Sequence, residues 1–221
     1  MLHRSMKRRT LARRRVGARG FAVHAGLFAA AVASAGLDPL LAQDATDRAV
    51  EAVRAGGVTL LCRHAATDSF DEREPVDYAD PSTQRRLSPE GLAQSDSIGA
   101  VLRRLGIRLG EVVSSPMDRA IGTAERIAPG HELRIDEAWH TNGSDYGGPP
   151  NDRRRRQLAE VVVGGVRLVV SHIGTMSSVV PEVRDGVGEG DCAVVRGDGE
   201  THDYIGIIPW ARWMELPASV R

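Results

Sequence analysis

Two strand-like apolar runs of the sequence end on side chains that could bind or attack a phosphoryl group. Val58–Cys62 is apolar or β-branched and is followed at once by Arg63 and His64, and Val166–Ser171 is followed by His172. A guanidinium and an imidazole are costly to desolvate at the end of a buried strand unless a site needs them. Arginine offers a planar fork of donors that matches phosphoryl oxygens, and imidazole is a competent nucleophile toward phosphorus. The pattern predicts phosphoryl chemistry.

A third strand end supplies a second arginine. Glu111–Ser114 is typical of a short strand, and the helix predicted over Met117–Ala128 carries Arg119. The carboxyl ends of parallel strands lie at one edge of a sheet, where ligands of α/β proteins bind. The two arginines and the two histidines are therefore expected to converge there. Ser114 and Ser115 are interpreted as turn formers and helix caps.

The elements that must position these side chains alternate along the chain. Helices are predicted at 47–56, 87–105, 117–128 and 152–163, and strands at 58–62, 111–114, 133–135, 166–171, 193–196 and 204–208. This alternation predicts an α/β fold with three layers, αβα, around a mostly parallel central sheet. Residues 68–86 and 142–150 are polar or rich in Gly and Pro, which predicts loops, and the first is expected to form a flap beside the first strand.

The first 42 residues are typical of an export signal. An Arg-rich segment precedes the apolar stretch Phe21–Leu37, and small residues offer cleavage after Ala35 or Ala42. The paired arginines resemble a twin-arginine signal, so the protein is expected in the periplasm or outside the cell. The apolar stretch is short for a membrane span, so no stable span is expected after cleavage, and 43–221 would form one domain. An uncleaved anchor is an open alternative.

Charge and cysteine content narrow the function classes. The formal net charge is zero, but the basic excess belongs to the N-terminal segment and the rest is net acidic, which argues against a general nucleic-acid binder. The seven histidines are scattered and show no metal-ligand spacing, so no metal is expected. Cys62 and Cys192 both lie in apolar strand-like runs, which favours two buried free thiols, although an exported protein could pair them.

Four motifs together carry a family resemblance. They are L-L-C-R-H-A-A-T, L-S-P-E-G-L-A-Q, V-V-S-S-P-M-D-R-A-I-G-T-A-E and V-V-S-H, in that order. Over residues 57–210 the chain resembles the phosphoglycerate-mutase-like histidine phosphatase superfamily, and most of all its small exported bacterial members. The resemblance implies that His64 is the nucleophile that becomes phosphohistidine, that Arg63 and Arg119 clamp the phosphoryl oxygens, and that His172 stabilises charge in the transition state. Thr67 would add a contact, and no cofactor is implied.

The chain departs from the family pattern in places. The usual Gly after the nucleophile is Ala65, and Ile173 stands where phytase-like members carry an Asp, which argues against that branch. The proton-donating acid is harder to place, and Glu137 lies near the position that mutase-like members use. Four other residues compete for this role: Asp68, Glu72, Asp77 and His140.

The function predicted from the sequence is an exported, metal-independent phosphomonoesterase acting on a small phosphorylated substrate, such as an envelope sugar phosphate. The alternatives are a phosphate-binding envelope protein without turnover and a phosphatase of phosphohistidine proteins. The short segment between Arg119 and His172 leaves little room for the substrate-binding insert of true mutases, so mutase activity is not expected. The basic run Arg153–Arg156 is interpreted as a solvated helix face.

Overall fold

A six-stranded, mostly parallel sheet forms the centre of the fold. The computed structural model describes residues 39–69, 76–140, 148–184 and 186–217. The strands are β1 (Val58–Arg63), β2 (Leu109–Ser114), β3 (Leu133–Ile135), β4 (Val166–Ser171), β5 (Cys192–Gly197) and β6 (His202–Ile208). Their order in the sheet is β3-β2-β4-β1-β5-β6, and β5 alone runs in the direction opposite to the other five strands. The predicted fold class is confirmed.

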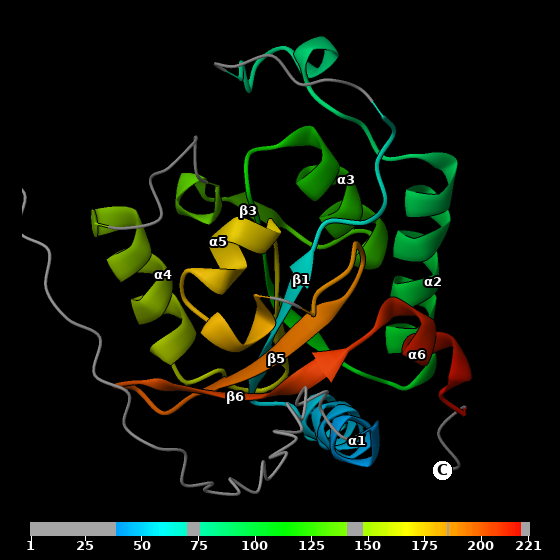
Figure 1. Ribbon diagram of the computed structural model, residues 1–221, viewed down its shortest axis with the longest axis vertical. Coiled ribbons are helices and arrows are strands. Elements are labelled where there is room, and N and C mark those ends of the chain that lie inside the picture. Colours follow the sequence, from blue (N-terminus) through cyan, green and yellow to red (C-terminus); the bar gives the residue numbers. More distant parts are fainter. Residues whose placement is uncertain (1–38, 70–75, 141–147, 185, 218–221) are drawn as a thin grey trace, which may run out of the picture. The chain divides into compact units, whose positions relative to one another are not determined.

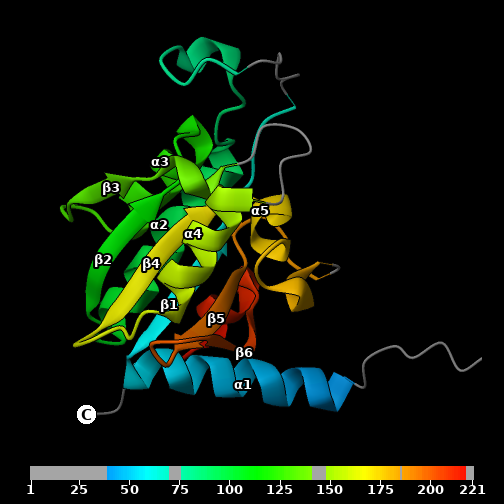
Figure 2. The same cartoon turned by 90° about the vertical axis from the view of Figure 1, so that its left-hand side faces the viewer.

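Helices cover both faces of this sheet (Figures 1 and 2). They are α1 (Pro39–Ala55), α2 (Pro89–Arg104), α3 (Asp118–Ile127), α4 (Gly148–Ala159), α5 (Ile173–Ser177) and α6 (Trp210–Glu215), with 3-10 turns η1 (Pro81–Thr83), η2 (Glu137–Trp139) and η3 (Pro181–Val183). Residues of α1, α2, α3 and α6 pack on one face, and residues of α4 and α5 on the other. Along β1, Leu60 and Leu61 face opposite cores, which explains why this strand is continuously apolar.

Two helices, α1 and α4, have bounds that differ clearly from the predicted ones. Helix α1 begins at Pro39 rather than at residue 47, so it extends back into the segment interpreted as part of the export signal. Helix α4 begins at Gly148, inside the predicted loop 142–150, because prolines are well tolerated in the first turn of a helix. Its C-terminal end at Ala159 comes before the predicted residue 163. Helix α5, directly after His172, was missed because five residues carry no helical period.

Helix α2 matches its prediction and lies close to the chain that leaves β1. The Ser88 side chain accepts a hydrogen bond from the Gly91 amide, and Pro89 occupies the first turn. A Cβ atom at Gly91 would lie 1.9 Å from the carbonyl oxygen of Ala66. Glycine at this position therefore lets α2 approach the segment just after the first histidine.

The expectation of two free thiols is wrong, because Cys62 and Cys192 form a disulfide. The two residues face each other across the antiparallel pair β1 and β5, with Cα atoms 3.9 Å apart, and both are fully buried. The sequence could not show this, because the residues are 130 positions apart and only the strand pairing brings them together. The disulfide joins β1, just before Arg63, to the start of β5.

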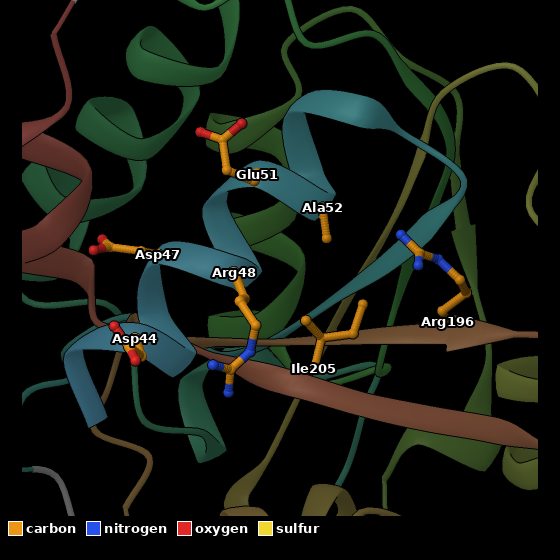
Figure 3. Close-up of a pocket in the computed structure, with 7 residues that line it drawn as sticks. All are labelled: Asp44, Asp47, Arg48, Glu51, Ala52, Arg196 and Ile205. Atoms are coloured by element: carbon orange, nitrogen blue, oxygen red, sulfur yellow. The ribbon is translucent and has the colours of Figure 1, made fainter. Parts of the chain in front are cut away.

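Two further regions bear on the sequence predictions. Residues 1–38, with most of the predicted export signal, lie outside the described residues. Within the described part of the chain, no helix has the length and apolar character needed to cross a membrane. A surface pocket lies between α1 and the β5–β6 hairpin (Figure 3), where Arg48 and Arg196 mix with acidic side chains of α1. None of the predicted site residues lines it.

Candidate active site

Hydrogen bonds between neighbouring strands continue past the ends of β1, β2 and β4. The His64 amide donates to the carbonyl of Ser171 at 2.9 Å, and the Ser115 amide donates to that of Val170 at 3.0 Å. These bonds carry the sheet register one residue further, so the side chains that follow the strands meet. The ring centroids of His64 and His172 are 5.3 Å apart.

His64 is held as a neutral, buried imidazole. Its side chain is almost fully buried, and Nδ1 lies 2.9 Å from the carbonyl oxygen of Ala65. A carbonyl can only accept, so Nδ1 carries the proton and Nε2 keeps its lone pair. Burial lowers the pKa of His64 to about 3, and the positive charges of Arg119, Arg63 and Arg85 add to this effect. The ring is therefore uncharged at neutral pH and has the free lone pair that its predicted role as nucleophile requires.

His172 lies beside His64 and is held from both ring nitrogens. The Ser115 hydroxyl is 2.7 Å from Nε2, and Nη2 of Arg119 is 3.4 Å from Nδ1. Burial lowers the pKa of His172 well below its ordinary value, and the neighbouring His64 and Arg119 lower this pKa further. Ser115 also accepts a hydrogen bond from the Met117 amide, so it caps the turn as predicted and also positions the second histidine.

Arg63 and Arg119 frame the two imidazoles. Arg119, in the first turn of α3, is 5% exposed. Arg63 donates from Nη1 to the carbonyl of Val187 at 3.1 Å, while its buried Nε has no hydrogen-bond partner among the described residues. A guanidinium N–H in this position can donate to an oxyanion.

Glu189 is a site residue that sequence reasoning missed. One carboxylate oxygen, Oε1, lies 3.5 Å from Nη2 of Arg63, 3.3 Å from the Thr67 hydroxyl and 4.0 Å from Nδ1 of His64. Thr67 therefore contacts the site through this carboxylate. An isolated acid between two glycines in a loop gives no pattern that would reveal it.

Arg85 was missed as well. Its positive charge lowers the pKa values of His64 and His172, which places it within electrostatic reach of both rings. The preceding residue, Gln84, is buried, and its side-chain oxygen accepts from the Asp118 amide at the start of α3 at 2.8 Å. The end of the predicted flap is thereby tied to the helix that carries Arg119.

The structure does not link Glu137 to the other predicted site residues. Its side chain is exposed, and no hydrogen bond, ion pair or ring contact joins it to them within the described ranges. Asp68 and Asp77 are also exposed. Asp77 accepts from the Ala79 amide in a local turn, and Asp68 accepts from the Arg86 amide, 18 residues further along the chain. Glu72 lies outside the described residues. His140 does reach the site, because its ring centroid is 5.0 Å from that of His172.

The arginine run on α4 is only partly the solvated face that was predicted. Arg153, Arg155 and Arg156 are exposed, but Arg154 is fully buried. Arg154 donates to backbone carbonyls at the end of η2, including that of His140 at 3.3 Å. A guanidinium can be buried when its donors are satisfied in this way.

Comparisons with known proteins agree with this geometry. Residues 59–163 match the model of the histidine phosphatase superfamily, branch 1. This match identifies residues 59–163 as a segment of the histidine phosphatase superfamily. The chain is a phosphatase of this type, and the predicted nucleophile and both arginines of the family pattern are placed together in its fold. A search of curated proteins finds no match.

Solved structures of histidine phosphatases share the fold. The protein histidine phosphatase SixA, complexed with tungstate, aligns with 17% identity and a TM-score of 0.54, over 70% of this chain and 97% of that one. An Escherichia coli K-12 protein described as an alpha-ribazole-5'-P phosphatase aligns with 15% identity and a TM-score of 0.52, over 70% and 98%. At these identities the likeness concerns the fold.

Ala65 stands in place of the usual family glycine. It is fully buried, and its amide donates a hydrogen bond to the Thr123 hydroxyl at 3.1 Å.

Proposed function

We propose that this chain is an exported, metal-independent phosphomonoesterase that works through a phosphohistidine on His64. The observation that carries the proposal is the buried, neutral imidazole with Nδ1 tied to its own backbone. Nε2 attacks phosphorus, the P–O bond to the leaving group breaks, and water then cleaves the P–N bond to release phosphate. The whole cycle needs only side chains that the chain itself supplies.

The cationic groups around His64 stabilise the phosphoryl group during transfer. Arg63 and Arg119 supply fixed guanidinium donors from two different elements, and Arg85 adds a third positive charge. Preorganised charge of this kind lowers the barrier, because it needs no rearrangement as negative charge shifts in the transition state. Both ring nitrogens of His172 are engaged, by Ser115 and Arg119, so His172 would hydrogen-bond a phosphoryl oxygen by exchanging one of these contacts.

Export is the second element of the proposal. The sequence of residues 1–42 supports it, and so does the disulfide between Cys62 and Cys192, because structural disulfides form mainly in oxidising compartments. The substrate would then be a small phosphomonoester of the envelope, such as a sugar phosphate. Fractionation of the producing cells checks this: recovery of the uncleaved, reduced chain in the cytoplasm would contradict export.

The chemical step is tested by trapping. The full chain should release phosphate from an aryl phosphate in the presence of EDTA, and rapid quenching at alkaline pH, where phosphohistidine persists, should trap a labelled phosphoenzyme. His64→Ala should lose both the label and the turnover. Unchanged turnover in this variant would refute the assignment of His64, and tight phosphate binding without turnover in the wild type would favour a binding protein.

A further inference from the structure

Beyond the residues that bind and attack the phosphoryl group, the reaction needs a proton for the leaving oxygen. We propose that His140 supplies this proton and that Tyr78 positions its ring. The inference rests on the proposed function, since it assigns one more role in the same reaction. It assigns the proton to His140, one of the candidates named from the sequence, in place of Glu137.

His140 and Tyr78 extend the row of rings that begins at the nucleophile. The His172 centroid lies 5.3 Å from that of His64 and 5.0 Å from that of His140, which meets it edge-on. The Tyr78 hydroxyl lies 2.7 Å from Nδ1 of His140, and the two rings are also edge-on. The row thus leads from the nucleophile to the segment that carries η1.

This placement suits the leaving-group side of the pocket. His64 follows β1 and His172 follows β4, so the attack on phosphorus comes from the ends of the central strands. In an in-line transfer the leaving oxygen departs on the opposite side of phosphorus from Nε2 of His64. The segment that carries η1 rises beyond the strand ends (Figure 1). Tyr78 comes shortly before η1 in the sequence, and His140 directly follows η2. Side chains from these two segments can therefore meet the departing oxygen.

The backbone that presents His140 is fixed by side chains of two other elements. The fully buried Arg154 of α4 donates to the carbonyls of Ala138 and His140. The hydroxyl of Ser171, at the end of β4, donates to the carbonyl of Trp139 at 2.7 Å. A proton donor must be held within hydrogen-bond reach of its target, and this support restricts the movement of the imidazole.

The carboxylates near the site are less well placed for this role. Glu137, Asp68 and Asp77 are all exposed. Asp77 is bonded within a turn, and Asp68 accepts from the backbone amide of Arg86. Glu189 lies on the Nδ1 side of His64, away from the nitrogen that attacks phosphorus. Among the described candidates, His140 is the one in ring contact with His172.

The proton balance closes over one cycle. As Nε2 of His64 bonds to phosphorus, the P–O electron pair goes to the leaving oxygen, which takes the proton from Nε2 of the His140 imidazolium. His140 is then neutral and accepts a proton from the water that attacks phosphorus, while the P–N electron pair returns to His64. The products are an alcohol and phosphate, and both imidazoles are restored.

A series of aryl phosphates tests this role, from dinitrophenyl phosphate, whose leaving group needs no proton, to phenyl phosphate, whose leaving group does. For His140→Asn, kcat/KM should stay close to the wild-type value with dinitrophenyl phosphate and fall about 100-fold with phenyl phosphate. Turnover of dinitrophenyl phosphate should show a burst, since hydrolysis of the phosphoenzyme also lacks its base. Tyr78→Phe should give a smaller loss with the same dependence on the leaving group, and His131→Asn, an exposed histidine, should give none.

Equal losses of kcat/KM with every leaving group, or no loss with phenyl phosphate, would overturn the role of His140. If His140→Asn fails to fold, Tyr78→Phe still tests the proposal, because it removes only a hydroxyl. A folded Tyr78→Phe whose activity depends on the leaving group as the wild type's does would then overturn the roles proposed for His140 and Tyr78. A wild type that traps no phosphohistidine refutes the proposed function itself, which is a distinct result.

Discussion

Glu189 places one carboxylate oxygen 3.5 Å from Nη2 of Arg63 and thereby sets a negative charge beside the arginine at the end of β1. The side chain is about one-quarter exposed, so water partly screens this interaction. The carboxylate opposes the binding of a phosphate dianion in the same pocket. At the same time it holds Arg63 and Thr67 in place.

Removing the charge of Glu189 should strengthen phosphate binding. In Glu189→Gln, the inhibition constant for inorganic phosphate should fall about three- to tenfold. The variant loses a negative charge that repels the phosphate, and water already screens part of that repulsion. The value of kcat should fall too, since Arg63 loses a partner that fixes its orientation. Steady-state inhibition measures both effects, and Glu200→Gln, on the exposed turn between β5 and β6, is the matched control. Weaker or equal phosphate inhibition in Glu189→Gln would contradict this electrostatic role.

The disulfide connects the nucleophile strand to the loop that carries Glu189. Cys62 immediately precedes Arg63, and Cys192 follows Asp191, whose carbonyl accepts the Arg63 amide at 3.0 Å. Replacing both cysteines by alanine should lower the free energy of unfolding by about 2–5 kcal/mol, because a cross-link over a long loop restricts the unfolded chain. Urea unfolding of the wild type and the double variant checks this. If reductant destabilised the double variant as much as the wild type, the disulfide would not be the cause.

The four residues named first from the sequence were predictable because topology alone places them. Arg63 ends β1, and His64 and His172 directly follow β1 and β4. Arg119 lies in the first turn of the helix after β2, so the meeting of these side chains needs only the strand order. The family pattern adds a predicted role for each of them.

Other parts of the site depend on tertiary contacts that no local pattern shows. Glu189 and Arg85 lie on irregular segments, and their positions depend on bonds such as that of Gln84 to α3. Arg154 appeared to belong to a solvated run, because the sequence does not show which of four adjacent arginines turns toward the carbonyls of η2. The pairing of Cys62 with Cys192 likewise needed the register between β1 and β5.

The neutral state of His64 makes the stability of the fold depend on pH. Burial lowers the pKa of His64 to about 3, whereas an unfolded histidine titrates near 6.5. Between these values the unfolded chain binds the extra proton, so this contribution to stability is complete above pH 6.5 and is lost as pH falls toward 3. Lowering the pH from 7 to 5 should therefore reduce the free energy of unfolding by about 2 kcal/mol through His64. Urea unfolding of His64→Asn should show a pH dependence that is smaller by that amount, while His131→Asn, exposed on the surface, should behave like the wild type. Identical pH dependence in wild type and His64→Asn would show that the folded protein accepts the proton on His64 and that its nucleophile is not kept neutral by burial.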